Sequence, residues 1–316
     1  MKLLVTGGAG YIGSVVAAQL IIAGHDVVVL DNLSTGHRDA LVDGAQFLQE
    51  ELSHVAQVLD GSFDGVLHFA AKSLVAESVE RPEIYWDNNV VETLALLEAM
   101  RAAGVERLIF SSTAAIYGVP IRVPIREGDP AAPINPYGQT KLAVDVAITA
   151  AARAHGLAAA SLRYFNVGGA QGRLGERHSP ETHLIPNILQ VPLGIRESVS
   201  IFGSDYDTRD GTCIRDYLHV VDLGRAHLLA LTAVQPGTHI IYNLGSGTGY
   251  TVREVVDSCR RVTGHPVPSV DRGRRSGDPP ALVASSELIQ AELGWKTELD
   301  LDRIVSDSWS FATGHA

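Results

Sequence analysis

The feature that most constrains this chain is a glycine-rich turn near its N-terminus, Gly7-Gly8-Ala9-Gly10-Tyr11-Ile12-Gly13. The short apolar run Lys2–Thr6 before it predicts a buried parallel strand, and the apolar spacing of Ser14–Ala23 after it predicts a helix. The N-terminus of such a helix offers unpaired N–H groups and a positive dipole end, which attract phosphate. The stretch therefore predicts a phosphate-binding unit of strand, turn and helix.

Three glycines of this turn have separate expected roles. Gly7 allows a sharp turn, Gly10 allows the backbone to approach a pyrophosphate, and Gly13 allows helix and strand to pack closely. The next apolar run, His25–Asp31, predicts a second strand that ends in a carboxylate. Asp31 would accept hydrogen bonds from a ribose diol and repel a 2′-phosphate, which predicts NAD rather than NADP. The alternatives are an ordinary structural glycine turn and, for Asp31, a helix cap or solvated turn residue.

The composition narrows the class of protein. The chain has 316 residues, of which 46% are hydrophobic, and no apolar run approaches the length of a membrane span, so we expect a soluble protein with no membrane partner. The glycine turn comes too early for a secretory signal, and the two cysteines fit a reducing cytoplasm and form no metal-binding pattern. The net charge of −11 argues against nucleic-acid binding, so we expect local arginines and backbone amides to hold an anionic ligand.

Strand-like and helix-like runs alternate along the first half of the chain. This alternation predicts an α/β fold with a doubly wound parallel Rossmann sheet. The expected strands are 45–48, 65–69, 107–111 and 158–163, and the expected long helices are 86–103 and 137–155.

The texture changes after Asn166, where glycine, proline and histidine dominate 167–186 without a clear period. A strand at 240–245 and a helix at 251–262 then suggest a return to the first domain. We expect an NAD-binding domain over 1–166 with return segments near 210–262, and a smaller, interleaved α/β substrate domain over 167–316. We expect the polar stretch 272–280 to form a surface loop.

A second constellation joins Ser111-Ser112-Thr113 at a strand end with Tyr137 and Lys141 at a helix start. Residues four apart share one helix face, so Tyr137 and Lys141 can point into one site. A nearby ammonium favours the phenolate, which would make Tyr137 a base near neutral pH. The Thr113 hydroxyl could bridge this phenol and a substrate hydroxyl. The alternative is a plain surface pair.

Longer motifs make the chain resemble the extended short-chain dehydrogenase/reductase family, and within it the sugar-nucleotide epimerases. The resemblance covers Gly7 to Trp295, nearly the whole chain. Beyond the glycine turn and the tyrosine-lysine pair, the matching motifs are Asp31-Asn32-Leu33, His68-Phe69-Ala70-Ala71, Glu77-Ser78-Val79, Asp87-Asn88-Asn89-Val90, Ser111-Ser112-Thr113-Ala114, Asn135-Pro136-Tyr137-Gly138, Arg163-Tyr164-Phe165-Asn166, His183-Leu184-Ile185-Pro186, Asp210-Gly211-Thr212-Cys213-Ile214-Arg215-Asp216-Tyr217 and Arg274-Arg275-Ser276-Gly277-Asp278-Pro279.

The resemblance implies an NAD-dependent 4-epimerase that interconverts UDP-glucose and UDP-galactose through a 4-keto sugar, with UDP-N-acetylhexosamines as further candidate substrates. It implies catalysis by Tyr137, Lys141 and Thr113, and a homodimer paired through helices near 88–100 and 141–154. The implied cofactor contacts are Gly7, Gly10, Tyr11, Ile12, Gly13, Asp31, Asn32, Glu51, Leu52, Phe69, Ala70, Ala71, Asn88, Ser111, Tyr137, Lys141 and Tyr164. The implied substrate contacts are Thr113, Tyr137, Asn166, His183, Leu184, Arg215, Arg275, Asp278 and Leu282.

Several positions depart from the better-known family pattern. Glu51 stands where many relatives carry an aspartate that contacts adenine, and Ser73 stands where some carry a lysine near the cofactor ribose, so the latter contact is not expected here. His183 replaces an asparagine of some members. Leu282 occupies a pocket position where a tyrosine restricts the site to plain hexoses and a smaller residue admits N-acetyl groups.

Other functions remain as alternatives. A 4-epimerase acting on UDP-glucuronate or a UDP-pentose would share the fold, although no arginine is clearly assigned to a second carboxylate. A 4,6-dehydratase needs an acid pair beside the threonine, where this chain has Ala114-Ala115. A non-catalytic sensor of NAD or nucleotide sugar would have no use for a basic tyrosine.

Overall fold

The computed structural model describes residues 1–275 and 278–314, so two residues of the polar stretch 272–280, Ser276 and Gly277, lie outside it. The chain divides into two compact units, each built from separated segments. The first unit comprises Met1–Val119, Pro130–Tyr164 and Gly224–Tyr242, and the second comprises Pro120–Asp129, Phe165–Leu223 and Asn243–Ala316. The expected NAD-binding domain over 1–166, with further segments of that domain near 210–262, remains a prediction.

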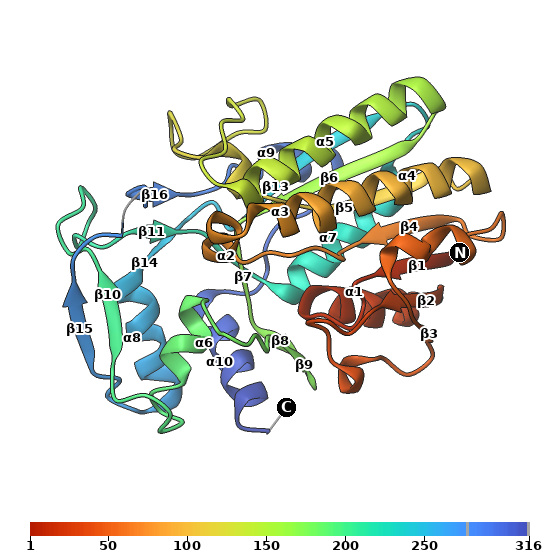
Figure 1. Cartoon of the computed structure of the whole chain (residues 1–316). Helices are drawn as coiled ribbons and strands as arrows, with labels where there is room; N and C mark the ends of the chain where they lie inside the picture. The colour runs from red at the N-terminus through yellow and green to blue at the C-terminus, as the bar shows by residue number, and fades with distance from the viewer. Residues whose placement is uncertain (276–277, 315–316) are drawn as a thin grey trace. The chain divides into compact units, whose positions relative to one another are not determined.

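A seven-stranded sheet forms the centre of the first unit (Figure 1). Its strands are β1 (Lys2–Thr6), β2 (Asp26–Asp31), β3 (Gln46–Gln49), β4 (Gly65–His68), β5 (Arg107–Thr113), β6 (Ala158–Tyr164) and β13 (His239–Leu244). They lie in the order β13-β6-β5-β4-β1-β2-β3, and β1 to β6 pair in parallel. The order reverses between β1 and β4, where the carboxyl ends of a doubly wound sheet bind ligands. The predicted fold class is confirmed.

Helices cover both faces of this sheet (Figure 1). The helices and helical turns of the first half are α1 (Tyr11–Ile22), η1 (Arg38–Ala40), η2 (Leu52–Gln57), α2 (Val75–Glu80), α3 (Pro82–Tyr85), η3 (Trp86–Val91), α4 (Glu92–Ala103), η4 (Ala114–Tyr117) and α5 (Pro136–His155), and α7 spans Val220–Ala233. On one face, α4 and α5 bury apolar side chains such as Leu96 and Ile148 against Leu4 and Phe110 of the strands. Burial of this kind is the main stabilising term of such a layer.

Two helices differ from the sequence expectations by more than a shift of one residue. The first helix begins at Tyr11 rather than Ser14, because Gly10 has an extended backbone and serves as its N-cap. The long helix expected over 86–103 begins instead as a π-helical turn, η3, and continues as α4. The apolar period that predicts a helix does not distinguish these hydrogen-bond patterns.

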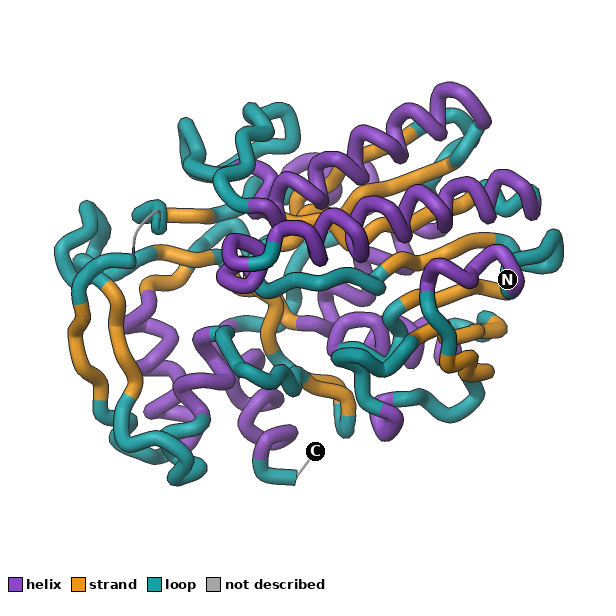
Figure 2. The backbone as a smooth tube through the Cα atoms, in the orientation of Figure 1, coloured by secondary structure: helices purple, strands orange, loops and turns teal. Residues whose placement is uncertain are grey.

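The second unit is built from small sheets and short helices, seen as alternating orange and purple segments in Figure 2. The strands pair as β7 (Asn166–Gly168) with β12 (Tyr217–His219), β8 (Ala170–Gln171) with β9 (Leu174–Gly175), β10 (Val199–Phe202) with β15 (Ser269–Arg272), and β11 (Ile214–Arg215) with both β14 (Tyr250–Thr251) and β16 (Ala281–Leu282). The helices are α6 (Leu184–Leu189), α8 (Val252–Thr263), α9 (Glu287–Leu293) and α10 (Leu301–Ala312), and a core lies among α6, α8 and α10. Within the described ranges, no helix is both long enough and apolar enough to cross a membrane.

Candidate active site

The glycine turn has the tight geometry that the sequence predicts. Gly7 follows β1 with φ +72°, and a Cβ atom there would lie 2.5 Å from the backbone nitrogen of Ala70. A Cβ at Gly13 would lie 2.2 Å from the Gly7 carbonyl oxygen. At Gly10 the nearest protein atom would be 3.3 Å away. Packing within the protein therefore requires glycine at positions 7 and 13. At position 10 the protein leaves room for a Cβ, so the absence of a side chain there suits a ligand that approaches the turn.

The N-terminus of α1 fits a pyrophosphate. Its N-cap, Gly10, has no side chain to cap the helix, and the first turn carries no acidic residue. The first intrahelical bond runs from Ser14 N to Gly10 O at 3.0 Å, so the N–H groups before it point out of the helix end. Tyr11 and Ile12, both half-buried, form this first turn beside Gly13. This arrangement binds anions through backbone donors and the helix dipole.

Asp31 ends β2 beside the glycine turn. Its carboxylate accepts hydrogen bonds from the backbone N–H of Ala9 at 3.0 Å and of Leu33 at 2.8 Å. Each oxygen of a carboxylate accepts more than one bond, so the group can hold the turn and still accept from a ribose hydroxyl. The residue expected to select NAD is therefore also a structural part of the turn.

The remaining expected cofactor contacts have mixed surroundings. Asn32 donates to Glu51 Oε2 at 2.8 Å, so the half-buried Asn32 and the exposed Glu51 are held together. The Leu52 side chain, by contrast, is buried in the core of the first unit, which leaves its backbone as the group that a cofactor could meet.

Phe69 packs on the His227 ring with centroids 4.9 Å apart, and Asn88 Oδ1 accepts from Lys72 N at 3.0 Å. Ala70 and Ala71, both half-buried, follow Phe69 at the end of β4.

Tyr137 and Thr113 come together at the end of β5 and the start of α5. Asn135 caps α5 by accepting from Gly138 N at 2.8 Å, and Pro136 occupies the first helical turn, which places Tyr137 at the helix start. Burial raises the pKa of Tyr137, and its hydrogen bond with the Thr113 side chain opposes that rise. The spacing of Lys141 predicts a lowered pKa for Tyr137, whereas burial in the structure raises it. The expected pairing of Tyr137 with Thr113 is present.

Lys141 lies one turn along α5, with its side chain buried. Its ammonium donates to the Ser111 carbonyl oxygen at 2.9 Å and lies 4.7 Å from the centre of the Phe110 ring. Burial lowers the pKa of Lys141 to about 7, and the Asp145 carboxylate partly opposes that change. The Ser111 hydroxyl is also hydrogen-bonded to the phenol of Tyr164. Lys141, Ser111 and Tyr164 thus meet at the carboxyl ends of β5 and β6.

Two buried networks beside this site carry residues to which the sequence reasoning gave no role. Arg163 donates to Asp145 Oδ2 through Nε at 3.1 Å and through Nη2 at 2.8 Å, and Nη1 donates to the Tyr117 phenol at 3.0 Å. His68 connects Thr6 and Thr93, with its ring nitrogens 2.6 and 2.9 Å from their hydroxyls. Burial, and then the Lys141 charge, lower the pKa of His68 to about 3. His68 and Arg163 each stand in a motif of the resemblance, but no pattern in the sequence indicates which residues they contact.

In the second unit, three expected substrate residues come together. Arg215 of β11 lies opposite Leu282 of β16 in a parallel register, and its guanidinium forms an ion pair with Asp278. It also donates to the Pro279 carbonyl oxygen at 3.0 Å. Arg215 thus forms an ordinary ion pair with Asp278. The same ion pair holds the guanidinium in a fixed orientation. A planar fork held in this way suits phosphate oxygens.

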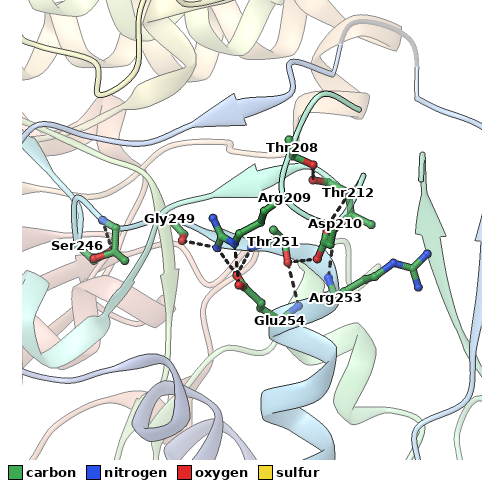
Figure 3. Close-up of polar contacts among 10 residues, drawn as sticks. Thr208, Arg209, Asp210, Thr212, Ser246, Gly249, Thr251, Arg253 and Glu254 are labelled. Atoms are coloured by element: carbon green, nitrogen blue, oxygen red, sulfur yellow. Dashed lines mark hydrogen bonds and ion pairs between the residues drawn. The ribbon is translucent and has the colours of Figure 1, made fainter. Parts of the chain in front are cut away.

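Two acidic residues support this small sheet. Asp216 accepts from the backbone N–H of Ser246, Gly247 and Ala284 at 2.6–3.0 Å, which fixes the segment after Arg215. The preceding turn is held by Asp210, whose carboxylate accepts from Thr212 and from Thr251, the N-cap of α8 (Figure 3). Asp210 and Asp216 of the Asp210 to Tyr217 motif therefore serve mainly to position Arg215.

The other expected substrate residues lie in separate surroundings within the second unit. Asn166 begins β7, and its N–H donates to Asp216 O at 2.9 Å, one residue from Arg215. The Arg275 guanidinium lies 4.0 Å from the centre of the Phe202 ring. Leu184 begins α6 and packs on the core of this unit. His183 faces Glu176 and Glu181 at 2.8 and 2.9 Å, so its ring is engaged with carboxylates.

Comparison with known proteins decides the family. The model of the NAD dependent epimerase/dehydratase family matches residues 3–245. The chain belongs to this family. A UDP-glucose 4-epimerase from Corynebacterium glutamicum is 56% identical over 316 residues, covering 99% of this chain and 96% of the relative. A second, from Streptomyces lividans, is 56% identical over 319 residues, covering 99% and 97%.

Solved structures agree with this membership of the NAD dependent epimerase/dehydratase family. The crystal structure of UDP-glucose 4-epimerase from Brucella ovis in complex with NAD matches with a TM-score of 0.94 and 45% identity, covering 98% of both chains. NAD is the cofactor of this family, and the glycine turn, the uncapped α1 N-terminus and Asp31 all fit it.

Proposed function

We propose that this chain catalyses the interconversion of UDP-glucose and UDP-galactose by oxidation and re-reduction at C4 of the hexose. Full-length relatives 56% identical to it carry the name UDP-glucose 4-epimerase. The observation that carries the proposal at the level of the residues is the Tyr137 phenol hydrogen-bonded to Thr113 beside the buried Lys141 ammonium. These are the groups that proton transfer at a sugar hydroxyl requires.

Each residue has a definite task in the proposed reaction. Tyr137 accepts the proton of the 4-hydroxyl, and Thr113 orients that hydroxyl by donating and accepting hydrogen bonds. When bound, NAD supplies the acceptor for the C4 hydride and later its donor. Loss of the proton and the hydride leaves a 4-keto sugar, and return of the hydride to the opposite face of C4 gives the epimer. The proposed task of the Lys141 ammonium is to favour the phenolate form of Tyr137 against the rise in pKa that burial causes.

The nucleotide part of the substrate needs firm binding while the hexose turns. Arg215 is the proposed phosphate contact because its guanidinium is held by Asp278 and by backbone oxygens. Asn166, His183, Leu184, Arg275 and Asp278 are proposed to contact the same UDP moiety. A bound diphosphate keeps the keto sugar from leaving, so strong anchoring serves the reaction itself.

The direct test is to mix the purified protein with UDP-galactose and measure UDP-glucose. The reaction should need no added nicotinamide when NAD stays bound. Absence of UDP-glucose from a sample that carries NAD would refute the epimerase proposal. A 4,6-dehydratase would instead release water and form a 4-keto-6-deoxy sugar, and Ala114-Ala115 in η4 provide no acid for that step.

Leu282 is the proposed determinant of the accepted hexose. It is half-buried on β16 opposite Arg215, and an apolar branched side chain leaves more room than a tyrosine. We expect UDP-N-acetylgalactosamine to react more slowly than UDP-galactose. Leu282→Tyr should selectively reduce the activity on UDP-N-acetylgalactosamine. Equal loss of both activities in Leu282→Tyr, or no wild-type activity on the acetylated sugar, would contradict this role.

We further propose that the protein is a homodimer that works in the cytoplasm. Val91 of η3, Leu94 of α4 and Val146 of α5 are exposed apolar residues of the first unit, with 58%, 47% and 61% of their surface accessible. Apolar residues on adjacent helices suit a subunit interface. Light scattering should give twice the chain mass, and Leu94→Glu should give monomers. For the cytoplasm, support comes from Cys213 and Cys259, which are buried and free.

A further inference from the structure

A compact group of metal-type donors lies in the second unit, in the segment that joins β9 to α6. Glu176, His178, Glu181 and His183 each turn one donor atom to a common point, and these four atoms all lie within 4.8 Å of one another. The sequence predicts no metal site, because its two cysteines form no metal-binding pattern. Glu-x-His-x-x-Glu-x-His in this chain instead supplies nitrogen and oxygen donors.

The distances suit a small divalent cation. His183 Nδ1 lies 2.8 Å from Glu176 Oε1 and 2.9 Å from Glu181 Oε1. His178 Nδ1 lies 3.2 Å from Glu176 Oε1 and 3.7 Å from Glu181 Oε2. Around a tetrahedral zinc ion with bonds of about 2.0–2.2 Å, neighbouring ligand atoms lie about 3.3–3.6 Å apart. These four separations lie on either side of that range, and the donor atoms of the whole group lie within 4.8 Å of one another, so side-chain movements would bring them around one ion.

The site is built differently from a surface ion pair. The side chains of Glu176 and Glu181 are only 9% and 8% exposed, although carboxylates normally remain in water. Glu181 Oε1 accepts from the backbone N–H of Thr182 at 2.7 Å and of His183 at 2.8 Å, which fixes the carboxylate. His178 Nδ1 is buried and has no aligned hydrogen-bond partner within the described segments. Fixed carboxylates and an inward-pointing imidazole nitrogen without such a partner are features of a ligand sphere.

We propose that Glu176, His178, Glu181 and His183 bind one zinc ion. Imidazole nitrogen combined with carboxylate oxygen favours zinc, whereas calcium and magnesium favour oxygen ligands alone. Four protein ligands form a closed site, which is the structural rather than the catalytic type. The ion would fix the segment that ends at His183, the N-cap of α6. Zinc would occupy one ring nitrogen of His183, so the UDP contact proposed above for His183 would be made by another part of that residue. The zinc site does not depend on the reaction catalysed.

Zinc titration of the untagged, full-length protein after chelator treatment tests the proposal. Calorimetry near pH 8, where metal ligands are more readily deprotonated, should give one zinc per chain. The melting midpoint should rise as zinc increases beyond its dissociation constant. Magnesium and calcium should produce neither effect. Cobalt in place of zinc should show the visible absorption of tetrahedral coordination.

Two variants and a matched control give the test its specificity. His178→Asn and Glu176→Gln should each weaken zinc binding by about 10- to 100-fold or more, as losses around metal sites do. The control is His54→Asn with Glu50→Gln, because that pair has the same chemistry at 2.8 Å on the exposed surface. The control should bind zinc like the wild type. Melting with chelator present measures the folding of each variant separately, so a lost zinc response at an unchanged midpoint supports the site.

Three results would overturn the proposal. The first is no zinc bound by the wild type. The second is equal zinc binding by the wild type and both variants, which would place the ion among the other histidines. The third is equal weakening in the His54 and Glu50 control. Epimerase activity is measured alongside, and an inactive protein that still binds one zinc leaves this site standing while refuting the proposed reaction.

Discussion

Alanine at Gly10 and at Gly13 should damage the protein in two different ways. The backbone of Gly10 has φ −82° and ψ 175°, which any residue adopts, and a Cβ there would lie no closer than 3.3 Å to a protein atom. At Gly13 the same atom would lie 2.2 Å from Gly7 O and 2.9 Å from its carbonyl carbon. Because those are backbone atoms, no side-chain rotation can relieve the contact.

The expected magnitudes follow from these distances. Alanine at the Gly10 N-cap costs about 0.5–1 kcal/mol, and reduced freedom of the unfolded chain returns about 0.4–1 kcal/mol, so stability should hardly change. A methyl group against the pyrophosphate should cost about 1–3 kcal/mol in NAD binding, which is about 5- to 150-fold. For Gly13→Ala, overpacking of about 3 kcal/mol exceeds the gain in helix propensity of about 1 kcal/mol, so unfolding stability should fall by about 2 kcal/mol.

The assay pairs urea unfolding of the NAD-free protein with calorimetric titration of NAD. Gly24→Ala is the matched control, because Gly24 follows α1 with φ +83° and a Cβ there would have no atom within 4 Å. Its strain of about 1–2 kcal/mol should lower stability without changing NAD affinity. The reasoning is refuted if Gly10→Ala binds NAD like the wild type, or if it destabilises the protein as much as Gly13→Ala does.

Three further perturbations test the site. Tyr137→Phe should lower turnover by about 10²- to 10⁴-fold while nucleotide binding persists, and a variant with more than about a tenth of wild-type kcat would exclude Tyr137 as the base. Burial lowers the pKa of His68 to about 3, so below about pH 6.5 the unfolded chain binds a proton that the folded chain does not. Lowering the pH from about 7.5 to 5 should therefore cost about 2 kcal/mol of unfolding free energy through this group. Urea midpoints of His68→Gln should lack that component, and an identical pH response would contradict it. Arg215→Lys should raise KM for UDP-galactose by about 10- to 100-fold with a smaller effect on kcat, because the fork is lost, and an unchanged KM would remove Arg215 from phosphate binding.

The sequence by itself predicted those parts of the protein that depend on short stretches of chain. The strand, glycine turn and helix of Lys2–Ile22 form one continuous segment, and Tyr137 and Lys141 lie one helical turn apart. Asp31 could be placed because the length of the intervening helix fixes where the second strand ends. In each case the spacing along the chain sets the geometry, and so the fold class and the NAD-binding turn could be derived from spacing alone.

Only the tertiary structure decided which distant side chains meet. Arg215 and Asp278 form an ion pair across 63 positions, and Thr6 reaches His68 across 62. No period in the sequence indicates such pairs, because they arise when segments far apart in the chain pack side by side. The direction of the Tyr137 pKa was also beyond the sequence, since burial and not the lysine spacing decides it. The same holds for the Glu176 to His183 cluster, whose donors only a folded loop can turn inward.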